Sequence, residues 1–290
     1  MEVSELIKRV RRIEIQTRNL TNNVFAGEYH SAFKGRGMSF AEVREYQIGD
    51  DVRDIDWNVT ARTNRPHTKV YEEERELTVM MLVDVSGSSK FGTDLRTQRE
   101  LLTEIVATVA FSALQNNDKV GLILFSDMIE KYIPPKKGRK HILYIIRELL
   151  NFDPSHLQTN VRAGLEFLMQ VQRRHCIGFL LSDFIDTPDF ETQLSIATQK
   201  HDIVAVKAYD QRMKELPNVG LIKMQDAETG ACVIVDTASQ KVRDMHKNWW
   251  DNEVERLERM FRKTKVDYVP ISTSEDYVKP LQTLFKNRHR

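Results

Sequence analysis

Three side chains that carry oxygen atoms follow one apolar stretch of the sequence at a spacing that suits a metal ion. They are Asp84, Ser86 and Ser88, at positions i, i+2 and i+4. If the chain turns there, the carboxylate and both hydroxyls can face one point, and Gly87 between the serines permits close approach of the backbone. Hard oxygen donors with so few carboxylates suit Mg²⁺ or Mn²⁺ that keeps part of its water.

Two more oxygen ligands occur farther along the chain. Thr159 lies in the polar segment 153–160 before an expected helix, and Asp183 lies at the end of the apolar stretch 175–184. The spacing D-x-S-x-S is by itself a weak signal, because a short motif recurs by chance. What favours a site is its position at the end of the most apolar stretch of the chain.

The elements that must position these residues alternate along the chain. Continuous apolar stretches predict strands, and apolar residues three and four apart predict helices. We expect strands at 77–86, 118–126, 128–134 (an edge strand), 175–184, 202–209 and 266–272, with two more flanking 228–230. We expect helices at 1–22, 95–115, 138–152, 161–174, 188–200, 240–264 and 277–286, with loops and short strands over 25–76. This alternation predicts a largely parallel sheet covered by helices on both faces, which binds ligands at the carboxyl ends of its strands.

Asp84, Ser86, Ser88, Thr159 and Asp183, in that order among strands and helices, resemble the metal-ion-dependent adhesion site of von Willebrand factor A domains. Residues 25–63, together with the acidic run before the first strand, resemble the family called domain of unknown function 58 (DUF58). The resemblance implies an α/β fold, a Rossmann-like three-layer sandwich with a mostly parallel central sheet. It also implies an N-terminal helix and family-specific extension over 1–75 and a von Willebrand factor A-like domain over 76–290.

The same resemblance implies a function. The five residues would contact Mg²⁺ or Mn²⁺ directly or through water, and one coordination position would stay open for an aspartate or glutamate of a protein partner. The family further implies a MoxR-type AAA+ ATPase as partner. It also implies a role in the assembly or activation of other complexes, and a place among the aerotolerance-operon proteins of bacteria.

Two other functions compete with this interaction module. A strand-end aspartate, a nearby hydroxyl and a later strand-end aspartate also suit a Mg²⁺-dependent phosphoryl-transfer hydrolase. Ser86 argues against it, because such an enzyme would place a second carboxylate there for acid–base work. Ser86 also lacks the preceding glycine of a G-x-S-x-G nucleophile elbow. We therefore expect no enzyme, and the remaining alternative is a structural scaffold with a vestigial metal site.

Two other groups of residues have a structural and a functional interpretation. The acidic group is either a second cation site or docking arm, or, as we expect, a network of turns and ion pairs formed with Arg62 or Arg65. The apolar stripe of the helix at 240–264 is either a partner surface or, as we expect, part of the core. The acidic group is Asp50, Asp51, Asp54 and Asp56, and the stripe is Met245, Trp249, Val254, Leu257 and Phe261, with Trp250 beside it.

Composition limits the class of protein. The chain has 290 residues, with 43 Lys and Arg against 42 Asp and Glu, and a net charge of +1 argues against a general nucleic-acid or membrane-surface binder. No apolar run approaches the roughly 18 residues of a membrane span, and no apolar signal region follows the charged N-terminus, so we expect a cytoplasmic protein. Cys176 and Cys232 lack metal-site spacing, and we expect reduced, buried thiols.

Overall fold

The structure, a computed structural model, describes residues 11–14, 29, 32, 38–73, 76–93, 96–185 and 189–288. The chain forms two compact units, one made of residues 33–77 and the other of residues 1–32 and 78–290. Among the described residues, no helix combines the length and the apolar character needed to cross a bilayer.

The larger unit contains a six-stranded sheet with the strand order β10-β7-β6-β3-β4-β5. Neighbouring strands pair in parallel, except that β5 runs antiparallel to β4 at one edge. The chain moves from β3 outward to β5, returns to β6 beside β3, and then moves out to β10. The order therefore reverses between β3 and β6, which is where open parallel sheets bind ligands. The strands are β3 (Thr78–Asp84), β4 (Lys119–Phe125), β5 (Ile129–Lys136), β6 (Ile177–Ser182), β7 (Asp202–Tyr209) and β10 (Asp267–Ser272).

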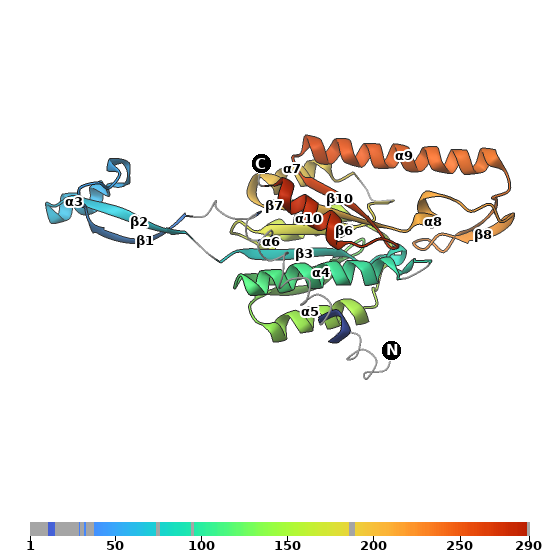
Figure 1. Ribbon diagram of the computed structural model, residues 1–290, viewed down its shortest axis with the longest axis horizontal. Coiled ribbons are helices and arrows are strands. Elements are labelled where there is room, and N and C mark those ends of the chain that lie inside the picture. The colour runs from blue at the N-terminus through green and yellow to red at the C-terminus, as the bar shows by residue number, and fades with distance from the viewer. Residues whose placement is uncertain are drawn as a thin grey trace. The chain divides into compact units, whose positions relative to one another are not determined.

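Helices cover both faces of this sheet (Figure 1). One face packs against α4 (Gln98–Gln115) and α10 (Val278–Asn287), with α5 (Arg139–Asn151) beside α4. The other face packs against α6 (Val161–Val171), α7 (Glu191–Lys200) and α9 (Gln240–Lys263). This arrangement confirms the three-layer α/β sandwich with a mostly parallel sheet.

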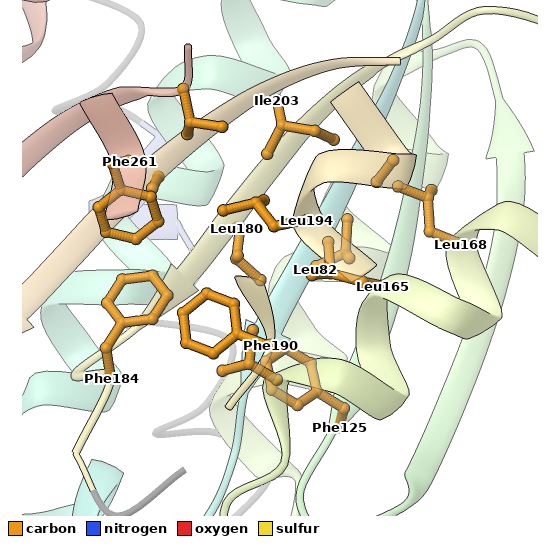
Figure 2. Packing of buried hydrophobic residues seen from close by; sticks show 14 of the residues in the cluster. Leu82, Phe125, Leu165, Leu168, Leu180, Phe184, Phe190, Leu194, Ile203 and Phe261 are labelled. Carbon is orange, nitrogen blue, oxygen red and sulfur yellow. The ribbon is translucent and has the colours of Figure 1, made fainter. Parts of the chain in front are cut away.

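Alternate residues of the central strands point into opposite layers, as the pleat of a strand requires. Phe179 of β6 meets Phe285 of α10 edge to face, with ring centroids 6.3 Å apart. Leu180, the next residue, joins the cluster on the other face (Figure 2). In that cluster the Phe184 ring lies 6.0 Å from Phe190 and 5.4 Å from Phe261. Each layer therefore has its own apolar core, and β3 and β6 are buried between them.

Residues near the N-terminus also pack against the larger unit. The Tyr29 side chain is fully buried, its ring lies 6.1 Å from Phe285, and its hydroxyl donates to Asp118 at 3.4 Å. Arg139 pairs with Glu14 at 2.5 Å. The helix expected over 1–22 is described only at 11–14, where the chain is helical, and the remainder of that prediction lies outside the described residues.

The smaller unit is built on two antiparallel strands, β1 (Met38–Glu45) and β2 (His67–Glu73). A short 3₁₀ helix, η2 (Val52–Asp54), and the helix α3 (Trp57–Thr63) lie between them in the chain. The expectation of loops and short strands for this region is therefore largely right, although it did not include the helix.

The acidic residues of the smaller unit form the expected network. Arg44 donates twice to Asp50, at 2.7 and 2.9 Å, and this pair together with the Gln47 backbone amide holds the pKa of Asp50 below its ordinary value. Asp51 accepts from the backbone of η2, and Asp56 caps α3. The ion-pair partners are Arg44 for Asp50 and Lys69, at 3.8 Å, for Asp56, whereas Arg62 acts on Asp56 only through its charge. Arg65 pairs instead with Glu45.

Two sequence-based predictions about burial need correction. The hairpin of β8 (Leu221–Gln225) and β9 (Cys232–Asp236) is largely exposed, and its residue Cys232 is exposed rather than buried. On α9, Met245 and Trp249 are exposed, whereas Trp250 is buried. The covered face of α9 therefore begins at Trp250 and continues through Leu257, seven residues on, and the first ten residues of the helix contribute no buried side chain.

The buried cysteine has a histidine neighbour that spacing did not predict. Cys176 Sγ lies 3.3 Å from His201 Nδ1. Burial raises the pKa of the Cys176 thiol to about 12 and lowers the pKa of His201 to about 4. Both side chains are therefore neutral near pH 7, and the pair lacks the thiolate that nucleophilic or metal chemistry requires.

Candidate metal site

The carboxyl end of β3 forms the first part of the site. Asp84 is the last residue of β3, and its carboxylate accepts hydrogen bonds from the Ser86 backbone amide at 2.9 Å and from the Ser182 hydroxyl at 2.6 Å. The turn brings the hydroxyls of Ser86 and Ser88 within 3.1 Å of each other. Three of the five predicted ligands therefore lie together at the point where the strand order reverses.

The carboxyl end of β6 supplies the next part. Asp183 directly follows Ser182 of β6, the strand that pairs with β3, and its Oδ1 accepts from the Ile185 backbone amide at 3.1 Å. Phe184 has a φ of 56°, which costs a residue with a side chain about 1–2 kcal/mol. Its ring packs in the core (Figure 2). Core packing thus holds the backbone bend that directly follows Asp183.

Two buried carboxylates therefore lie near each other. Asp84 and Asp183 are each only 3% exposed. Burial, and then the neighbouring Asp183 carboxylate, raise the pKa of Asp84 well above its ordinary value. Two such carboxylates repel each other, and a divalent cation between them would remove this repulsion. The donor set of the site therefore fits a cation.

A buried lysine lies on the neighbouring strand. Burial lowers the pKa of Lys207 to about 8, and the opposing influence of Asp183 is the largest that raises it. The Lys207 ammonium lies 4.9 Å from the centre of the Trp250 ring, a cation–π contact. Lys207 thus supplies a partial countercharge to the Asp183 carboxylate.

The loop that carries Thr159 is held in place from β4 and β5. The Glu130 carboxylate accepts from the backbone amides of Ser155 and His156, at 3.1 and 2.9 Å, and from the Ser126 hydroxyl at 2.9 Å. These three hydrogen bonds, against the opposing effect of burial, hold the pKa of Glu130 below its ordinary value. The charged Glu130 thus fixes the loop whose later residue, Thr159, is a predicted ligand.

Further contacts join this loop to the turn after β3. The Gly87 backbone amide donates to the Leu157 carbonyl at 2.8 Å. From α4, Arg99 donates to the carbonyls of Phe152 and Val85, at 2.5 and 3.0 Å, and to the Ser89 hydroxyl at 3.1 Å. Arg99 therefore ties the two ligand-bearing loops together.

The direct partner of Thr159 comes from the hairpin of β8 and β9. Glu228 lies in the turn between these strands, and its carboxylate accepts from the Thr159 hydroxyl at 2.6 Å and from the Thr159 backbone amide at 3.3 Å. Thr159 is 3% exposed. The fourth predicted ligand is thus covered by an acidic side chain 69 residues away in the chain.

Sequence reasoning missed Glu228, Arg99 and Glu130, and it assigned no role to Ser182. Ser182 has a signal, since it adjoins Asp183 at a strand end, where polar residues gather around ligands. Glu228 lies in an E-T-G turn between two expected strands, and nothing in that pattern indicates which part of the molecule the turn contacts.

The kind of ion that the site can hold follows from its donors. The described part of the chain contains no group of three or more His, Cys, Asp or Glu side chains arranged to bind a metal. A cation here would depend on two carboxylates and three hydroxyls, with water completing its shell. That set suits a hard ion such as Mg²⁺ or Mn²⁺ better than one that needs imidazole or thiolate ligands.

Comparisons with known proteins identify the family and the fold. A family model described as "Protein of unknown function DUF58" matches residues 42–255. The uncharacterized protein Rv1480 of Mycobacterium tuberculosis is 29% identical over 228 residues, which cover 78% of this chain and 72% of the relative.

Two solved structures are similar over most of the chain. The conserved hypothetical protein BatB from Bacteroides thetaiotaomicron superposes with a TM-score of 0.50 and 14% identity. An aerotolerance-related membrane protein from Bacteroides fragilis superposes with a TM-score of 0.50 and 12% identity. Each alignment covers 73% of this chain and 98% of the other. At such low identity the likeness speaks for the fold alone.

Proposed function

The chain belongs to the DUF58 family and has the fold of a von Willebrand factor A domain, and from this premise we propose that it is a non-enzymatic, Mg²⁺-dependent protein-interaction module. The observation that carries the proposal is the pair of buried carboxylates, Asp84 and Asp183, on the two strands where the sheet order reverses. Such a pair favours a bound cation, and a cation that keeps an open position attracts an acidic side chain.

Each residue has a role in this proposal. Asp84 and Asp183 supply the negative charge, and the hydroxyls of Ser86, Ser88 and Thr159 supply neutral oxygens. Ser182 orients the Asp84 carboxylate through its 2.6 Å hydrogen bond. When bound, Mg²⁺ supplies a positive charge to which the aspartate or glutamate of a partner can bind.

The arrangement favours binding over turnover. The Ser86 hydroxyl lies 3.1 Å from the Ser88 hydroxyl and also hydrogen-bonds to the Asp84 carboxylate, which the proposed cation would engage instead of leaving it as a base. Two hydroxyls next to each other are good neutral ligands but give neither an activated nucleophile nor a general acid. This supports an interaction module over a phosphoryl-transfer hydrolase.

The partner and the setting belong to the same proposal. We infer that the partner is a MoxR-type AAA+ ATPase, that it donates the acidic residue, and that the complex acts in the bacterial cytoplasm to assemble or activate other proteins. The DUF58 family resemblance implies this partner and this setting.

The test is affinity capture from a native bacterial lysate with wild-type protein in Mg²⁺, wild-type protein in EDTA, and the variant Asp183→Ala in Mg²⁺. The proposal expects a AAA+ ATPase to be retained by the wild type in Mg²⁺ and in neither other sample. Equal retention in all three samples would mean that the metal does not mediate the contact.

A further inference from the structure

We propose that Glu228 is a built-in competitor of the partner: its carboxylate covers the metal site at Thr159 and must leave before an acidic side chain of another protein can bind. This inference rests on the proposed function, since it concerns what reaches the same site. It adds a regulatory element of this chain, the β8–β9 hairpin, that the metal-site motif does not include.

The first support is the contact itself. Both carboxylate oxygens of Glu228 are engaged by one predicted ligand, Oε1 by the Thr159 hydroxyl at 2.6 Å and Oε2 by the Thr159 amide at 3.3 Å. A carboxylate beside a ligand of the site is the chemical group that the proposed partner would bring. Glu228 therefore stands where a second carboxylate would be repelled or excluded.

The second support is that the turn is built to present Glu228. The Asp226 carboxylate accepts from the backbone amides of Glu228 and Thr229, at 2.8 and 3.3 Å, and from the Thr229 hydroxyl at 2.6 Å. The backbone amide of Gly230, which has a φ of 73°, donates to the Asp226 carbonyl at 2.9 Å. The turn therefore has one defined conformation, and an ordered turn lowers the entropic cost of placing its carboxylate.

The third support is the close approach of the turn to the metal-binding loop. A Cβ atom added at Gly87 would lie 2.2 Å from the Ala227 carbonyl oxygen and 3.5 Å from Leu157 Cβ. Only glycine at position 87 leaves room for the turn where it lies. The residue between the two ligand serines thus accommodates the hairpin that carries Glu228.

The fourth support is that the hairpin can leave at small cost. Three of its apolar side chains are largely exposed: Leu221 at 73%, Val233 at 61% and Ile234 at 74%. A segment with few buried apolar contacts opens with a low free energy. A partner can therefore displace Glu228 without disturbing the apolar cores on either side of the sheet.

The experiment uses the full chain with Mn²⁺ as the metal and acetate as the carboxylate probe. Binding of both is followed by the water-proton relaxation of bound Mn²⁺, in the wild type and in Glu228→Gln. Glutamine has the same length and keeps the hydrogen-bonding capacity, but it loses the charge. The control is Glu215→Gln, an exposed carboxylate before β8.

We expect Mn²⁺ to bind all three proteins. Acetate should bind Glu228→Gln about tenfold more tightly than the wild type, if the site is open in about one tenth of wild-type molecules. Glu215→Gln should behave as the wild type. Equal acetate affinity in all three Mn²⁺-loaded proteins would overturn the proposal that Glu228 competes with the partner. It would leave the proposed metal-dependent interaction module standing.

A second readout needs no metal. Amide hydrogen exchange of residues 226–231 should be faster in Glu228→Gln than in the wild type. The reason is that the hydrogen bonds from Thr159 to the charged Glu228 carboxylate stabilise the turn in its observed position. Unchanged exchange would overturn the proposal on its own. Absence of Mn²⁺ binding in the wild type would instead refute the proposed function, and the competitor with it.

Discussion

At the residue scale, the proposed function rests on a pair of buried carboxylates. Asp84 and Asp183 are both 3% exposed, and burial together with the Asp183 charge raises the pKa of Asp84 well above its ordinary value. A fold that keeps two such groups together is destabilised by them unless something neutralises them. The carboxylate pair therefore lowers the stability of the folded protein, and a bound cation would remove this destabilisation.

The variant Asp183→Asn tests this cost directly. In EDTA it should be at least as stable as the wild type, because it removes the repulsion while its Oδ1 can still accept from the Ile185 amide. In Mg²⁺ at a hundred times the dissociation constant, the wild type should gain about 2.7 kcal/mol and the variant little. Urea unfolding with and without Mg²⁺ measures both. A variant that gains as much as the wild type would contradict the assignment of Asp183.

Asp210 gives a prediction with a pH dependence. Its carboxylate accepts from the Thr273 hydroxyl at 2.7 Å, the Thr93 hydroxyl at 2.8 Å and the Arg212 amide at 2.9 Å. Burial alone would raise its pKa, but these hydrogen bonds hold the pKa of Asp210 below its ordinary value. The stability from this group is therefore present above the unfolded pKa of about 3.9 and is lost as pH falls through the lower folded pKa.

The variant Asp210→Asn should accordingly lose about 1–3 kcal/mol of stability at pH 7, since hydrogen bonds to a charged group are replaced. The difference from the wild type should stay constant down to about pH 5 and shrink below about pH 4. Thermal unfolding across this range measures it. A difference that grows on acidification would show that the sign of the Asp210 shift is wrong.

The site residues differ in how far the sequence reveals them. Asp84, Ser86 and Ser88 form a compact motif after the most apolar strand, and Asp183 ends another apolar strand, so their shared position follows from sheet topology. Glu228 and Arg99 were missed because their roles depend on tertiary contacts. Glu228 reaches Thr159 across 69 residues, and no periodicity encodes that contact.

At the element scale, α9 shows a difference between the apolar stripe expected from the sequence and the residues that are buried in the structure. The sequence placed Trp249 on the apolar stripe with Trp250 beside it, whereas Trp250 is 3% exposed and Trp249 is 42% exposed. The helical period correctly predicts that apolar residues share a face, but it does not say which part of a long helix the sheet covers. The strands were easier, because a buried parallel strand is a continuous apolar run.

The two tryptophans provide a matched pair of variants. Trp250→Ala should cost about 3–5 kcal/mol, because it removes a buried ring that contacts Tyr209 and Lys207. Trp249→Ala should cost less than about 1 kcal/mol, as for a surface position. Chemical denaturation of both proteins measures the difference. Equal losses would mean that α9 packs along the stripe expected from the sequence.

At the scale of the whole molecule, distant parts of the chain complete the larger unit. Tyr29 precedes the smaller unit in the chain, yet its buried ring packs on Phe285 and its hydroxyl donates to Asp118. The family resemblance placed residues 1–75 together as an extension, and a single buried tyrosine leaves no signal in the sequence that would divide it. The described residues before 33 thus belong with a core that resumes at 78.

The variant Tyr29→Ala should therefore destabilise the larger unit by about 3–5 kcal/mol, the usual loss for a large buried aromatic side chain. Tyr29→Phe keeps the ring and should lose about 1 kcal/mol, the net value of one hydrogen bond. Denaturation followed by tryptophan fluorescence, in a background with Trp57→Phe and Trp249→Phe so that only Trp250 remains, reports on this unit. If Tyr29→Ala unfolds with the wild-type midpoint, the N-terminal residues do not contribute to its core.

The central claim, that this protein holds a divalent cation with Asp84, Ser86, Ser88, Thr159 and Asp183, is tested most directly by calorimetric titration of Mn²⁺ into wild-type protein and into Asp183→Asn. We predict one site per chain in the wild type, displaced by excess Mg²⁺, and loss of that site in the variant. No binding by the wild type, or the same binding by both proteins, would contradict the account.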